Sequence, residues 1–409
     1  MRIGLTIRSF YAHYGGLQAH AEQLVRELQS RGHEVVILTR SVSHSPSYRD
    51  FFFFSESVSH TEVNGLPVTV LCHPQWLNPL MWVVSKCLGR PTLWNFGIGL
   101  VEWVFLRQTL TAFQTVDVIH HVGQADELIG FVAAAAARDL KVPFLVQPTA
   151  HPGQWGDSPL DRYLYQQADR LLVHTEYERA SLKQMGLDTT FDVVGNGVED
   201  RHDGDGDRFR QKYGIDGPMF LFLGRKSRDK GYPLVKTAFR QVRLQHPQAL
   251  LVCIGPATEV EASTISEKGI LEMGFVSPQE KQDALAACTA LCVPSEGESF
   301  GLVYMEAARY VKPSIARRLP VLEELLGQYE AALLVGAACG SGNQVELQPV
   351  ELTEAMMRVL NDGVHTTSIG QNAYRISEEF LWSRVVLRFE AAYQRAIYDV
   401  PRKLYREIR

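Results

Sequence analysis

The sequence predicts an α/β protein in which two doubly wound parallel sheets follow one another along the chain. Short apolar runs of strand length alternate with amphipathic helical patterns over most of the 409 residues. The polar run RHDGDGDRF (201–209) interrupts this alternation, which then starts again. A chain of this length is typical of two or three domains. We therefore expect a first domain over residues 1–198, a second over 199–378 and a C-terminal helix over 379–409.

Strands of the first domain are expected wherever an apolar run is bounded by polar or glycine-rich segments. The loop SFYAHYGG follows the first run, and the helical pattern Leu17–Gln29 ends before Gly32, a residue that often terminates helices. The predicted strands are Arg2–Ile7, Glu34–Thr39, Pro67–Leu71, Val116–His120, Pro143–Gln147, Leu171–His174 and Phe191–Val194.

The second domain repeats the pattern after the polar run. Its predicted strands are Met219–Leu223, Ala249–Ile254, Ile270–Met273, Ala290–Val293, Pro313–Ala316 and Ala332–Val335, and a helix is expected at Phe300–Tyr310. Open α/β sheets bind ligands beyond the carboxyl ends of their strands. Two such sheets facing each other would therefore enclose a ligand cleft.

Composition narrows the classes of function. The formal charge of -5 and the lack of a long Lys/Arg block argue against a nucleic-acid partner. The six cysteines contain no C-x-x-C pair, which is typical of buried thiols in a reducing compartment. The N-terminus lacks a secretory apolar segment, and no apolar run of membrane-spanning length occurs. We expect a cytoplasmic protein that acts on small molecules.

Two glutamates, Glu298 and Glu306, stand eight residues apart in ESFGLVYMEA, where a strand ends and a helix begins. Free N–H groups at the helix start around Ser299–Leu302 favour an anion. Carboxylates gain nothing from phosphate, but they accept hydrogen bonds from hydroxyls. The pattern predicts a ligand with a central diphosphate and a hydroxyl-rich group at each end, namely a ribose and a sugar.

The segment GRKSRDKG (224–231) fits the same ligand. It follows the predicted strand Met219–Leu223 and places Arg225 and Lys230 at that strand's carboxyl end. Two cations there would clamp a diphosphate and stabilise the charge that develops on a leaving nucleoside diphosphate.

Together, GRKSRDKG and ESFGLVYMEA resemble the retaining glycosyltransferases of family 4. The resemblance extends almost end to end. YGGLQAHAEQLVRELQSRGHEV is similar to the family's glycine loop and first helix, PFLVQPTAHP to its histidine-bearing strand end, and GNGVED to its interdomain linker. FLWSRVVLRFEAAYQRAI resembles the terminal helix that crosses back to the first domain. The resemblance implies the GT-B fold, with two facing Rossmann-like domains.

The resemblance also implies roles for individual residues. Glu306 would hold the ribose diol, and Arg225 and Lys230 would bind the diphosphate. Glu298 would meet the donor sugar together with the backbone around Phe300, Gly301 and Leu302. In the first domain, Gly16 would approach the diphosphate and His151 would contact the transferred sugar, so that Glu298 and His151 are the candidate catalytic residues.

As for chemistry, the resemblance implies retention of anomeric configuration by front-face attack, in which the leaving phosphate helps to take the acceptor's proton. It implies no metal ion and no other cofactor besides the nucleotide-sugar substrate. Two cations and a helix start would already supply the positive charge.

The chain departs from the family at two places. Val311 stands where the family usually has glycine, and ARRLPVLEE (316–324) lacks the family's glycine pair. We expect these changes to remove close backbone approach to the phosphates. Arg317 or Arg318 could supply a cation instead, or the loop could serve a different donor, and the sequence leaves both open.

Three further segments have two interpretations each. His120 and His121 end a strand, and at most one of them would face the site. DGDGD (203–207) resembles a metal loop, but Arg208 and Gly214 stand where a calcium loop needs glycine and glutamate, so we expect a flexible acidic linker.

The third segment, Trp76–Phe113, is rich in large apolar residues, including Trp76, Trp82, Trp94, Trp103 and Phe105, with Lys86, Arg90 and Arg107 among them. We expect two buried helices there. An acceptor-site or membrane-surface element stays open as the alternative, and the same choice applies to Phe51–Phe54. With this alternative, a lipid-linked acceptor and a peripheral position at the membrane also stay open.

The sequence thus predicts a hexosyltransferase that moves a sugar from a nucleoside-diphosphate sugar to a hydroxyl of an unidentified acceptor. Two alternatives remain. One is a sugar-nucleotide epimerase of the same fold. The other is a nucleotide-sugar-binding module without turnover, which the altered ARRLP loop motivates.

Overall fold

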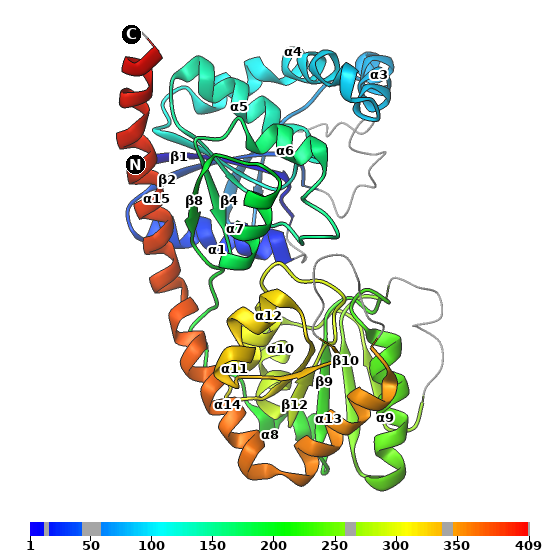
Figure 1. Ribbon diagram of the computed structural model, residues 1–409. Coiled ribbons are helices and arrows are strands. Elements are labelled where there is room, and N and C mark those ends of the chain that lie inside the picture. The colour runs from blue at the N-terminus through cyan, green and yellow to red at the C-terminus, as the bar shows by residue number, and fades with distance from the viewer. Residues whose placement is uncertain (12–15, 43–58, 258–266, 338–346, 408–409) are drawn as a thin grey trace. The chain divides into compact units, whose positions relative to one another are not determined.

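The computed structural model describes residues 1–11, 16–42, 59–257, 267–337 and 347–407 (Figure 1). Gly15, the segment Phe51–Phe54 and Cys339 lie outside the described residues. By its internal contacts the chain divides into two compact units. Unit 1 comprises Met1–Gly197 and Ser383–Arg409, and unit 2 comprises Val198–Trp382.

Unit 1 is built on an eight-stranded sheet in the order β3-β4-β2-β1-β5-β6-β7-β8. All neighbouring strands are parallel except β3 and β4. The strands are β1 (Arg2–Ser9), β2 (Glu34–Ser41), β3 (His60–Val63), β4 (Leu66–Val70), β5 (Val118–Val122), β6 (Phe144–Gln147), β7 (Arg170–Val173) and β8 (Thr190–Val193). Every strand predicted for this part is present, while β3 was not predicted. The sheet confirms the doubly wound arrangement.

Helices cover both faces of this sheet (Figure 1). α1 (Gly16–Ser30) lies on one face, and α4 (Trp94–Phe113) and α5 (Ile129–Leu140) lie on the other. A run of buried alanines, 133–137, lets α5 approach β5 closely. The remaining α-helices in the described part of unit 1 are α3 (Asn78–Leu88), α6 (Pro159–Tyr165), α7 (Glu176–Gln184) and α15 (Trp382–Glu407).

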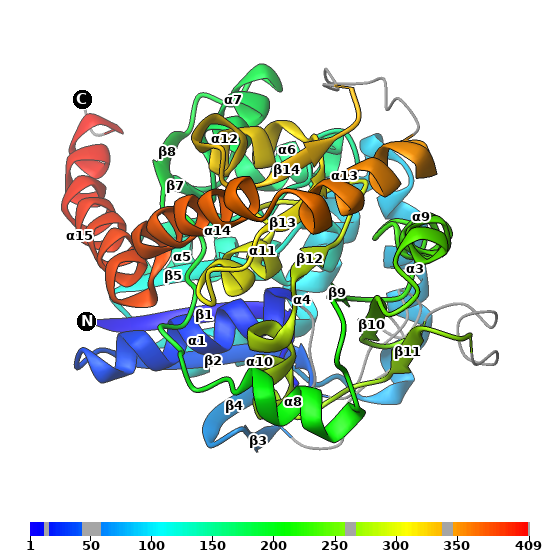
Figure 2. The ribbon, with the colours of Figure 1, turned by 90° about the horizontal axis from the view of Figure 1, so that it is seen from below.

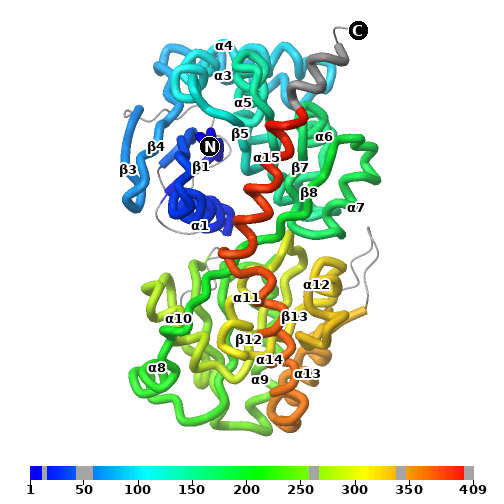
Figure 3. The backbone as a smooth tube through the Cα atoms, turned by 90° about the vertical axis from the view of Figure 1, so that its left-hand side faces the viewer, coloured from blue at the N-terminus to red at the C-terminus, as the bar shows by residue number. Residues whose placement is uncertain are grey.

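Helix α15 runs along unit 1 (Figure 3), and both polar contacts and buried apolar side chains hold it there. Glu390 accepts hydrogen bonds from Arg31 at 2.7 and 3.0 Å and lies 2.7 Å from Nε2 of His33. Further along, the hydroxyl of Tyr393 meets Nδ1 of His120 at 2.9 Å inside the core. The last long helix of the chain is therefore part of the first compact unit.

Unit 2 is built on a six-stranded, fully parallel sheet in the order β11-β10-β9-β12-β13-β14. The strands are β9 (Met219–Leu223), β10 (Leu250–Ile254), β11 (Ile270–Met273), β12 (Ala290–Cys292), β13 (Ser314–Arg317) and β14 (Leu333–Val335). All of them were predicted. The strand order reverses between β9 and β12, and such a switch point is where open α/β sheets bind ligands.

Seven helices belong to the described part of unit 2: α8 (Gly206–Tyr213), α9 (Tyr232–Gln245), α10 (Pro278–Ala287), α11 (Leu302–Ala308), α12 (Pro320–Leu325), α13 (Pro349–Asn361) and α14 (Gly363–Ser377). α13 packs beside α9, and α14 beside α11 (Figure 2). Apolar residues of these helices are buried against the sheet, which leaves its carboxyl edge to be lined by loops.

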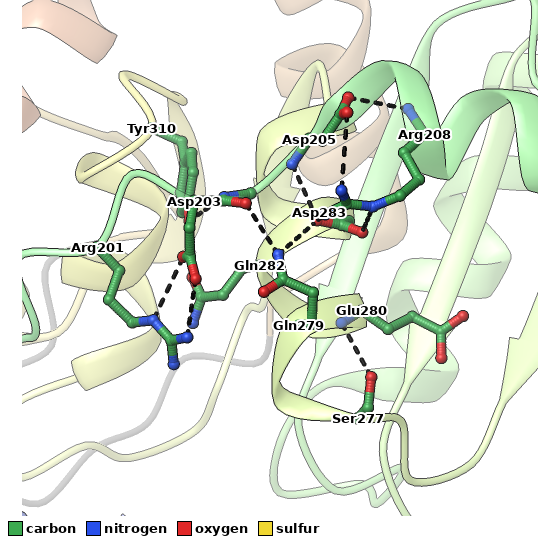
Figure 4. Close-up of polar contacts among 11 residues, drawn as sticks. Arg201, Asp203, Asp205, Arg208, Ser277, Gln279, Glu280, Gln282, Asp283 and Tyr310 are labelled. Atoms are coloured by element: carbon green, nitrogen blue, oxygen red, sulfur yellow. Dashed lines mark hydrogen bonds and ion pairs between the residues drawn. The ribbon is translucent and has the colours of Figure 1, made fainter.

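The acidic segment at 203–207 is held in place by many polar contacts, and the expectation of a flexible linker is wrong (Figure 4). The carboxylate of Asp205 caps α8 by accepting a hydrogen bond from the Arg208 amide at 3.0 Å. The Asp205 amide donates to Asp283 of α10 at 2.9 Å, and the guanidinium of Arg208 pairs with the same carboxylate. These contacts use the aspartates for N-capping and ion pairing.

Two helices do form within Trp76–Phe113, as predicted, but the expectation that they are buried is wrong for four large side chains of this segment. Trp76, Trp82, Phe96 and Trp103 expose 72%, 53%, 59% and 68% of their surface. Both helices bury one face and leave the other open. Periodicity alone could not reveal this, because α4 carries apolar residues on nearly every side.

Val311 adopts a left-handed backbone conformation, with φ of 57°, in the turn between α11 and β13. This turn lies at the amino end of β13, and ligands bind at the opposite, carboxyl edge of a parallel sheet. The expectation that the missing glycine removes backbone approach to the phosphates is therefore wrong for Val311. What the missing glycine does bring is strain, because a β-branched residue is disfavoured in this conformation.

We predict that Val311→Gly raises the free energy of unfolding by about 1 kcal/mol, because glycine relieves the left-handed strain. Val364, which is 86% exposed in the first turn of α14, supplies the matched control. Val364→Gly should lower the free energy of unfolding by about 0.5 kcal/mol, since glycine disfavours helix. Urea denaturation followed by circular dichroism measures both changes, and a loss of stability in Val311→Gly would contradict the strain.

Candidate active site

The candidate donor site of unit 2 is formed by loops that leave the carboxyl ends of neighbouring strands. GRKSRDKG follows β9, the loop with Glu298 follows β12, and Arg317 ends β13. These three strands are neighbours in the sheet. The switch point lies between β9 and β12, and β13 follows β12. Residues far apart in the sequence, Lys230, Glu298 and Arg317, are thereby brought to one edge of the sheet.

The first two loops are joined directly by their backbones. The Glu296 amide donates a hydrogen bond to the Asp229 carbonyl at 2.8 Å. Gly231 has φ of 73°, and a Cβ placed on it would lie 2.7 Å from Pro294. Only glycine combines this backbone conformation with such close approach, so this position fixes the spacing of the two loops.

Lys230 and Glu298 form an ion pair inside this site. The Lys230 ammonium donates to Oε1 of Glu298 at 2.7 Å, and the two side chains expose 20% and 12% of their surface. The residue predicted to bind diphosphate is thus in contact with the residue predicted to meet the donor sugar. At this burial the pair is less screened than a surface salt bridge.

Glu306 has a basic partner that the sequence did not indicate. Lys281 of α10 donates to Oε1 of Glu306 at 2.8 Å. α10 and α11 pack together, which brings a lysine 25 residues away onto the predicted ribose carboxylate. No sequence signal separates this lysine from other helix-surface lysines.

Helix α11 begins at Leu302, two residues later than predicted, and ends at Ala308, two residues earlier. The residue before it, Gly301, has φ of 83°, and a Cβ there would lie 2.6 Å from the Tyr304 ring. Phe300 is buried and packs edge-on against Phe380 at 5.0 Å. Only the backbone of Phe300 and Gly301 is therefore placed to face a ligand.

The remaining cations of the site differ in how they are held. Arg225 is half exposed and donates to Asp229 at 2.8 Å within its own loop. Arg318 is bound to Glu323 at 2.7 Å and to the Leu334 carbonyl at 3.2 Å. Arg317 is 7% exposed, and its buried Nε has no hydrogen-bond partner among the described residues.

In unit 1, Gly16 begins α1 and His151 follows β6. A Cβ on Gly16 would meet no atom within 4 Å, so the packing of unit 1 does not itself demand glycine there. The His151 ring packs on Trp155, with 4.0 Å between ring centroids, and the two residues form an isolated β-bridge. This bridge fixes the orientation of the loop that carries His151.

A buried polar network that the sequence analysis missed supports this region. Nδ1 of His20 lies 2.7 Å from the Asn196 side-chain oxygen, and Nε2 lies 3.0 Å from that of Gln147. Gln147 in turn meets Nε2 of His174 at 2.8 Å. Burial lowers the pKa of both histidines, which favours their neutral forms. The network ties the start of α1 to the ends of β6 and β7.

Glu178 holds the backbone of the loop that carries His151. Its two carboxylate oxygens accept hydrogen bonds from the amides of Ala150 at 2.8 Å and His174 at 2.7 Å. Burial raises the pKa of Glu178 to about 7, although both hydrogen bonds act in the opposite direction. Glu178 therefore holds the backbone of Ala150, the residue that precedes His151.

His120 and His121 serve the core. Both are fully buried: His120 contacts Tyr393 of α15, and His121 meets Thr6 of β1 at 3.0 Å. Burial lowers the pKa of His121 to about 4. In the part of the chain that is described, no group of three or more His, Cys, Asp or Glu side chains is arranged to hold a metal ion.

Comparison with known proteins agrees with this geometry. Residues 15–197 match the family described as "Glycosyl transferase 4-like domain", and residues 205–376 match "Glycosyl transferases group 1". D-inositol 3-phosphate glycosyltransferase 1 of Catenulispora acidiphila is 30% identical over 305 residues, which cover 66% of this chain and 71% of that protein. The enzyme of the same name from Acidothermus cellulolyticus is 26% identical, over 94% of this chain and 86% of its own.

The chain belongs to the family 4 glycosyltransferases. It is an enzyme of the hexosyltransferase type, and the family predicted from the sequence is confirmed.

Solved structures show the fold of this family 4 glycosyltransferase. The Anabaena protein HepE, crystallised with UDP and glucose, superposes with a TM-score of 0.70 at 18% identity, over 96% of this chain and 99% of its own. Sucrose-phosphate synthase of Thermosynechococcus elongatus gives 0.69 at 17% identity, over 96% and 98%. The GT-B fold is confirmed.

A titration test follows from the position of Glu178 in this glycosyltransferase. Its folded pKa of about 7 lies above its ordinary value of 4.5. The folded state therefore binds more protons between these two values, and the free energy of unfolding falls as pH rises through that window. By about pH 8 the loss attributable to this carboxyl reaches about 3 kcal/mol.

We predict that Glu178→Gln removes this dependence. Relative to the wild type, the variant should gain up to about 3 kcal/mol of unfolding free energy between about pH 5 and about pH 8. Urea titrations across this range measure the difference. Glu127, whose pKa burial raises to about 8, is present in both proteins and cancels. Parallel pH profiles for the two proteins would contradict the assignment.

Proposed function

We propose that this glycosyltransferase transfers a sugar from a nucleoside-diphosphate sugar to a hydroxyl acceptor, with retention of anomeric configuration. The observation that carries the proposal is the Lys230–Glu298 pair at the carboxyl ends of β9 and β12. One cation and one carboxylate in contact match the junction between a diphosphate and a sugar. Retention is proposed from the family, whose two-glutamate spacing the chain keeps.

Donor binding would exchange partners within this pair. The Lys230 ammonium has three N–H donors, so it can reach a phosphate oxygen while its contact with Glu298 loosens. Glu298 then accepts hydrogen bonds from sugar hydroxyls. As the bond to the sugar breaks, Lys230 stabilises the negative charge that develops on the departing diphosphate.

Glu306 would hold the ribose in the same way. Two ribose hydroxyls can donate to its two carboxylate oxygens. Lys281 keeps this carboxylate in place before the donor arrives, at a distance of 2.8 Å. The two glutamates would therefore bind opposite ends of the donor, with the diphosphate between them.

Names of related proteins direct the choice of substrates. The two relatives described above are named D-inositol 3-phosphate glycosyltransferases, and HepE was also crystallised with UDP-glucose. We propose a UDP-sugar as the first donor and D-inositol 3-phosphate as the first acceptor to test, with other sugars and lipid-linked hydroxyls after them. We also propose that turnover needs no metal ion, because lysine and arginine side chains supply the positive charge at the diphosphate.

The test begins with purified protein and a panel of UDP-, GDP- and ADP-sugars. Thermal shift identifies the nucleotide that binds, and mass spectrometry follows both nucleoside-diphosphate release and glycosylated acceptor, with and without EDTA. Transfer that survives EDTA supports the proposal, and nuclear magnetic resonance of the product reports the anomer. Donor conversion to an epimer, or binding with no turnover on any acceptor, would contradict it.

The two glutamates should separate binding from turnover. We predict that Glu298→Ala lowers kcat for transfer about 100-fold or more while the Kd for the free nucleoside diphosphate changes less than about threefold. Glu306→Ala should weaken nucleotide binding by about tenfold, because each hydrogen bond to a carboxylate contributes about 1.5 kcal/mol or more.

Calorimetric titration with the nucleoside diphosphate and a discontinuous transfer assay measure these effects. Glu354, an exposed glutamate of α13 in the same unit, supplies the control, and Glu354→Ala should leave both quantities unchanged. Unchanged transfer in Glu298→Ala would remove that residue from the proposed chemistry.

The adjacent arginines at the end of β13 allow a sharper comparison. We predict that Arg317→Gln weakens binding of the nucleoside diphosphate about tenfold, because its buried guanidinium has an unsatisfied Nε at the binding edge. Arg318→Gln should change the same Kd less than about twofold, because Glu323 and a backbone carbonyl already hold that side chain. Equal effects in the two variants would contradict a special role for Arg317.

A further inference from the structure

Helices α3 and α4 form a hairpin that exposes several large aromatic side chains. Neither the core of unit 1 nor the candidate active site accounts for them. The helices lie side by side at one end of the unit (Figure 3). We call the following exposed residues the hairpin surface: Trp82 and Lys86 of α3, Phe96, Trp103 and Arg107 of α4, Arg90 between the two helices, and Trp76 in the 3₁₀ turn (Gln75–Leu77) before α3. Large exposed aromatic groups on one surface mark an interaction site.

The exposure is not a sign of loose packing. On the inner side, Met81, Val84 and Cys87 of α3 are buried, and a Cβ on Gly97 of α4 would lie 2.8 Å from Cys87. The hairpin is therefore tightly joined along its inner face. Its outward positions follow from helix periodicity, with Trp82 and Lys86 on one turn-to-turn stripe of α3 and the exposed aromatics on a stripe of α4.

The partly buried Trp94 and the exposed tryptophans differ in the hydrogen bonding of their indole N–H groups. The indole N–H of Trp94 donates to the Leu88 carbonyl at 2.9 Å, and its ring packs on Tyr163. For Trp76, Trp82 and Trp103 the described residues provide no partner for the indole N–H. An indole combines an apolar ring with an N–H donor. It therefore suits an interface between an apolar phase and water.

The charge of the hairpin surface has one sign. Lys86, Arg90 and Arg107 are its charged members, and the Lys86 ammonium lies 5.4 Å from the centre of the Trp82 ring. The nearest acid on α4, Glu102, faces the other way toward Arg138 of α5 at 3.5 Å. The chain as a whole carries -5, so this positive surface is local. It complements an anionic partner.

Two kinds of partner could cover such a surface, a protein or a lipid bilayer. The buried centre of a protein interface is depleted in lysine, and a second copy of this chain would place three cations against three cations. Helices that lie in a membrane interface combine Trp and Phe with Lys and Arg, because the rings enter the headgroup boundary while the cations meet phosphates. No helix among the described residues is long and apolar enough to cross a membrane.

We propose that the hairpin surface docks unit 1 onto an anionic lipid bilayer, with Trp82, Phe96 and Trp103 entering the headgroup boundary and Lys86, Arg90 and Arg107 contacting lipid phosphates. Insertion of the aromatic rings and attraction between the cations and the lipid phosphates contribute separately to the free energy of binding. Ring insertion persists at high salt, whereas salt screens the charge attraction. The docking depends on neither the donor nor the acceptor chemistry.

Vesicle flotation of the purified full chain tests the proposal. The probes are phosphatidylcholine vesicles with none and with about 30% phosphatidylglycerol, at low and high salt. The wild type should float with the anionic vesicles. The variant W82S/W103S should bind them at least about tenfold more weakly at either salt concentration, and K86E/R107E should lose the preference for anionic lipid.

A matched control lies in unit 2, where Leu244 and Tyr329 are 76% and 48% exposed. The variant L244S/Y329S removes comparable apolar surface and should bind vesicles as the wild type does. Melting temperatures of all variants establish that they fold. Binding of UDP to unit 2 is measured in parallel, so failure of vesicle docking is distinct from failure of the proposed transfer activity.

Three results would overturn the proposal. The wild type could stay off anionic vesicles, or W82S/W103S could bind them as the wild type does. In the third, sedimentation equilibrium would show a wild-type dimer that the tryptophan substitutions abolish, which would assign the hairpin surface to a second copy of the chain. Flotation weakened by both variant pairs, with monomers throughout, supports the bilayer.

Discussion

The direction of the strands in unit 2 is the constraint on which its candidate site depends. Because β9, β12 and β13 are parallel and adjacent, their carboxyl ends bring Lys230, Glu298 and Arg317 to one edge. The reversal of strand order between β9 and β12 prevents a helix from crossing over that edge. Glycine sets the finer spacing, since Gly231 permits the approach to Pro294 and Gly301 permits the turn into α11. The local sequence thus matters chiefly where backbones come close.

Charge is balanced within this edge before any ligand binds. Glu298 and Glu306 each have a lysine within 3 Å, so neither carboxylate is held in the site at the full cost of burial. In the proposed function, a nucleotide sugar would exchange these lysine contacts for hydrogen bonds from its own hydroxyls, and it would also reach donors that have no partner in the free protein. The buried Nε of Arg317 is such a group, because an unsatisfied donor costs free energy until an anion reaches it. In that proposal the two lysines hold the carboxylates in place before the donor binds, and Arg317 adds to the affinity that the carboxylates provide.

The sequence was sufficient for the sheet and for the family, and its failures have physical causes. The repeated strand pattern predicted every strand but β3. The missed hairpin was signalled by Asn64-Gly65, whose φ values of 51° and 80° suit a tight turn, but the neighbouring strand is only four residues long. Lys281 and Glu178 could not be found from the sequence, because each acts through a contact between elements that local spacing does not encode. The acidic run at 203–207 was misjudged for the same reason, because its contact with Asp283 and its cap on α8 become visible only in three dimensions.

The α3–α4 hairpin shows how far periodicity can be trusted. A helix with apolar residues on nearly all sides is normally buried on all sides, and this expectation would have placed Trp103 in the core. Val101 and Phe105 of α4, two positions before and after Trp103, are buried in the core of unit 1, while Trp103 stays outside it. The aromatic side chains that remain outside destabilise nothing within the fold, so stability cannot account for them. Two features distinguish this surface from apolar residues that are merely exposed. The aromatic residues alternate with Lys86 and Arg107, and Glu102 pairs with Arg138 instead. In an anionic headgroup layer, both the rings and the cations of the hairpin surface would gain free energy together.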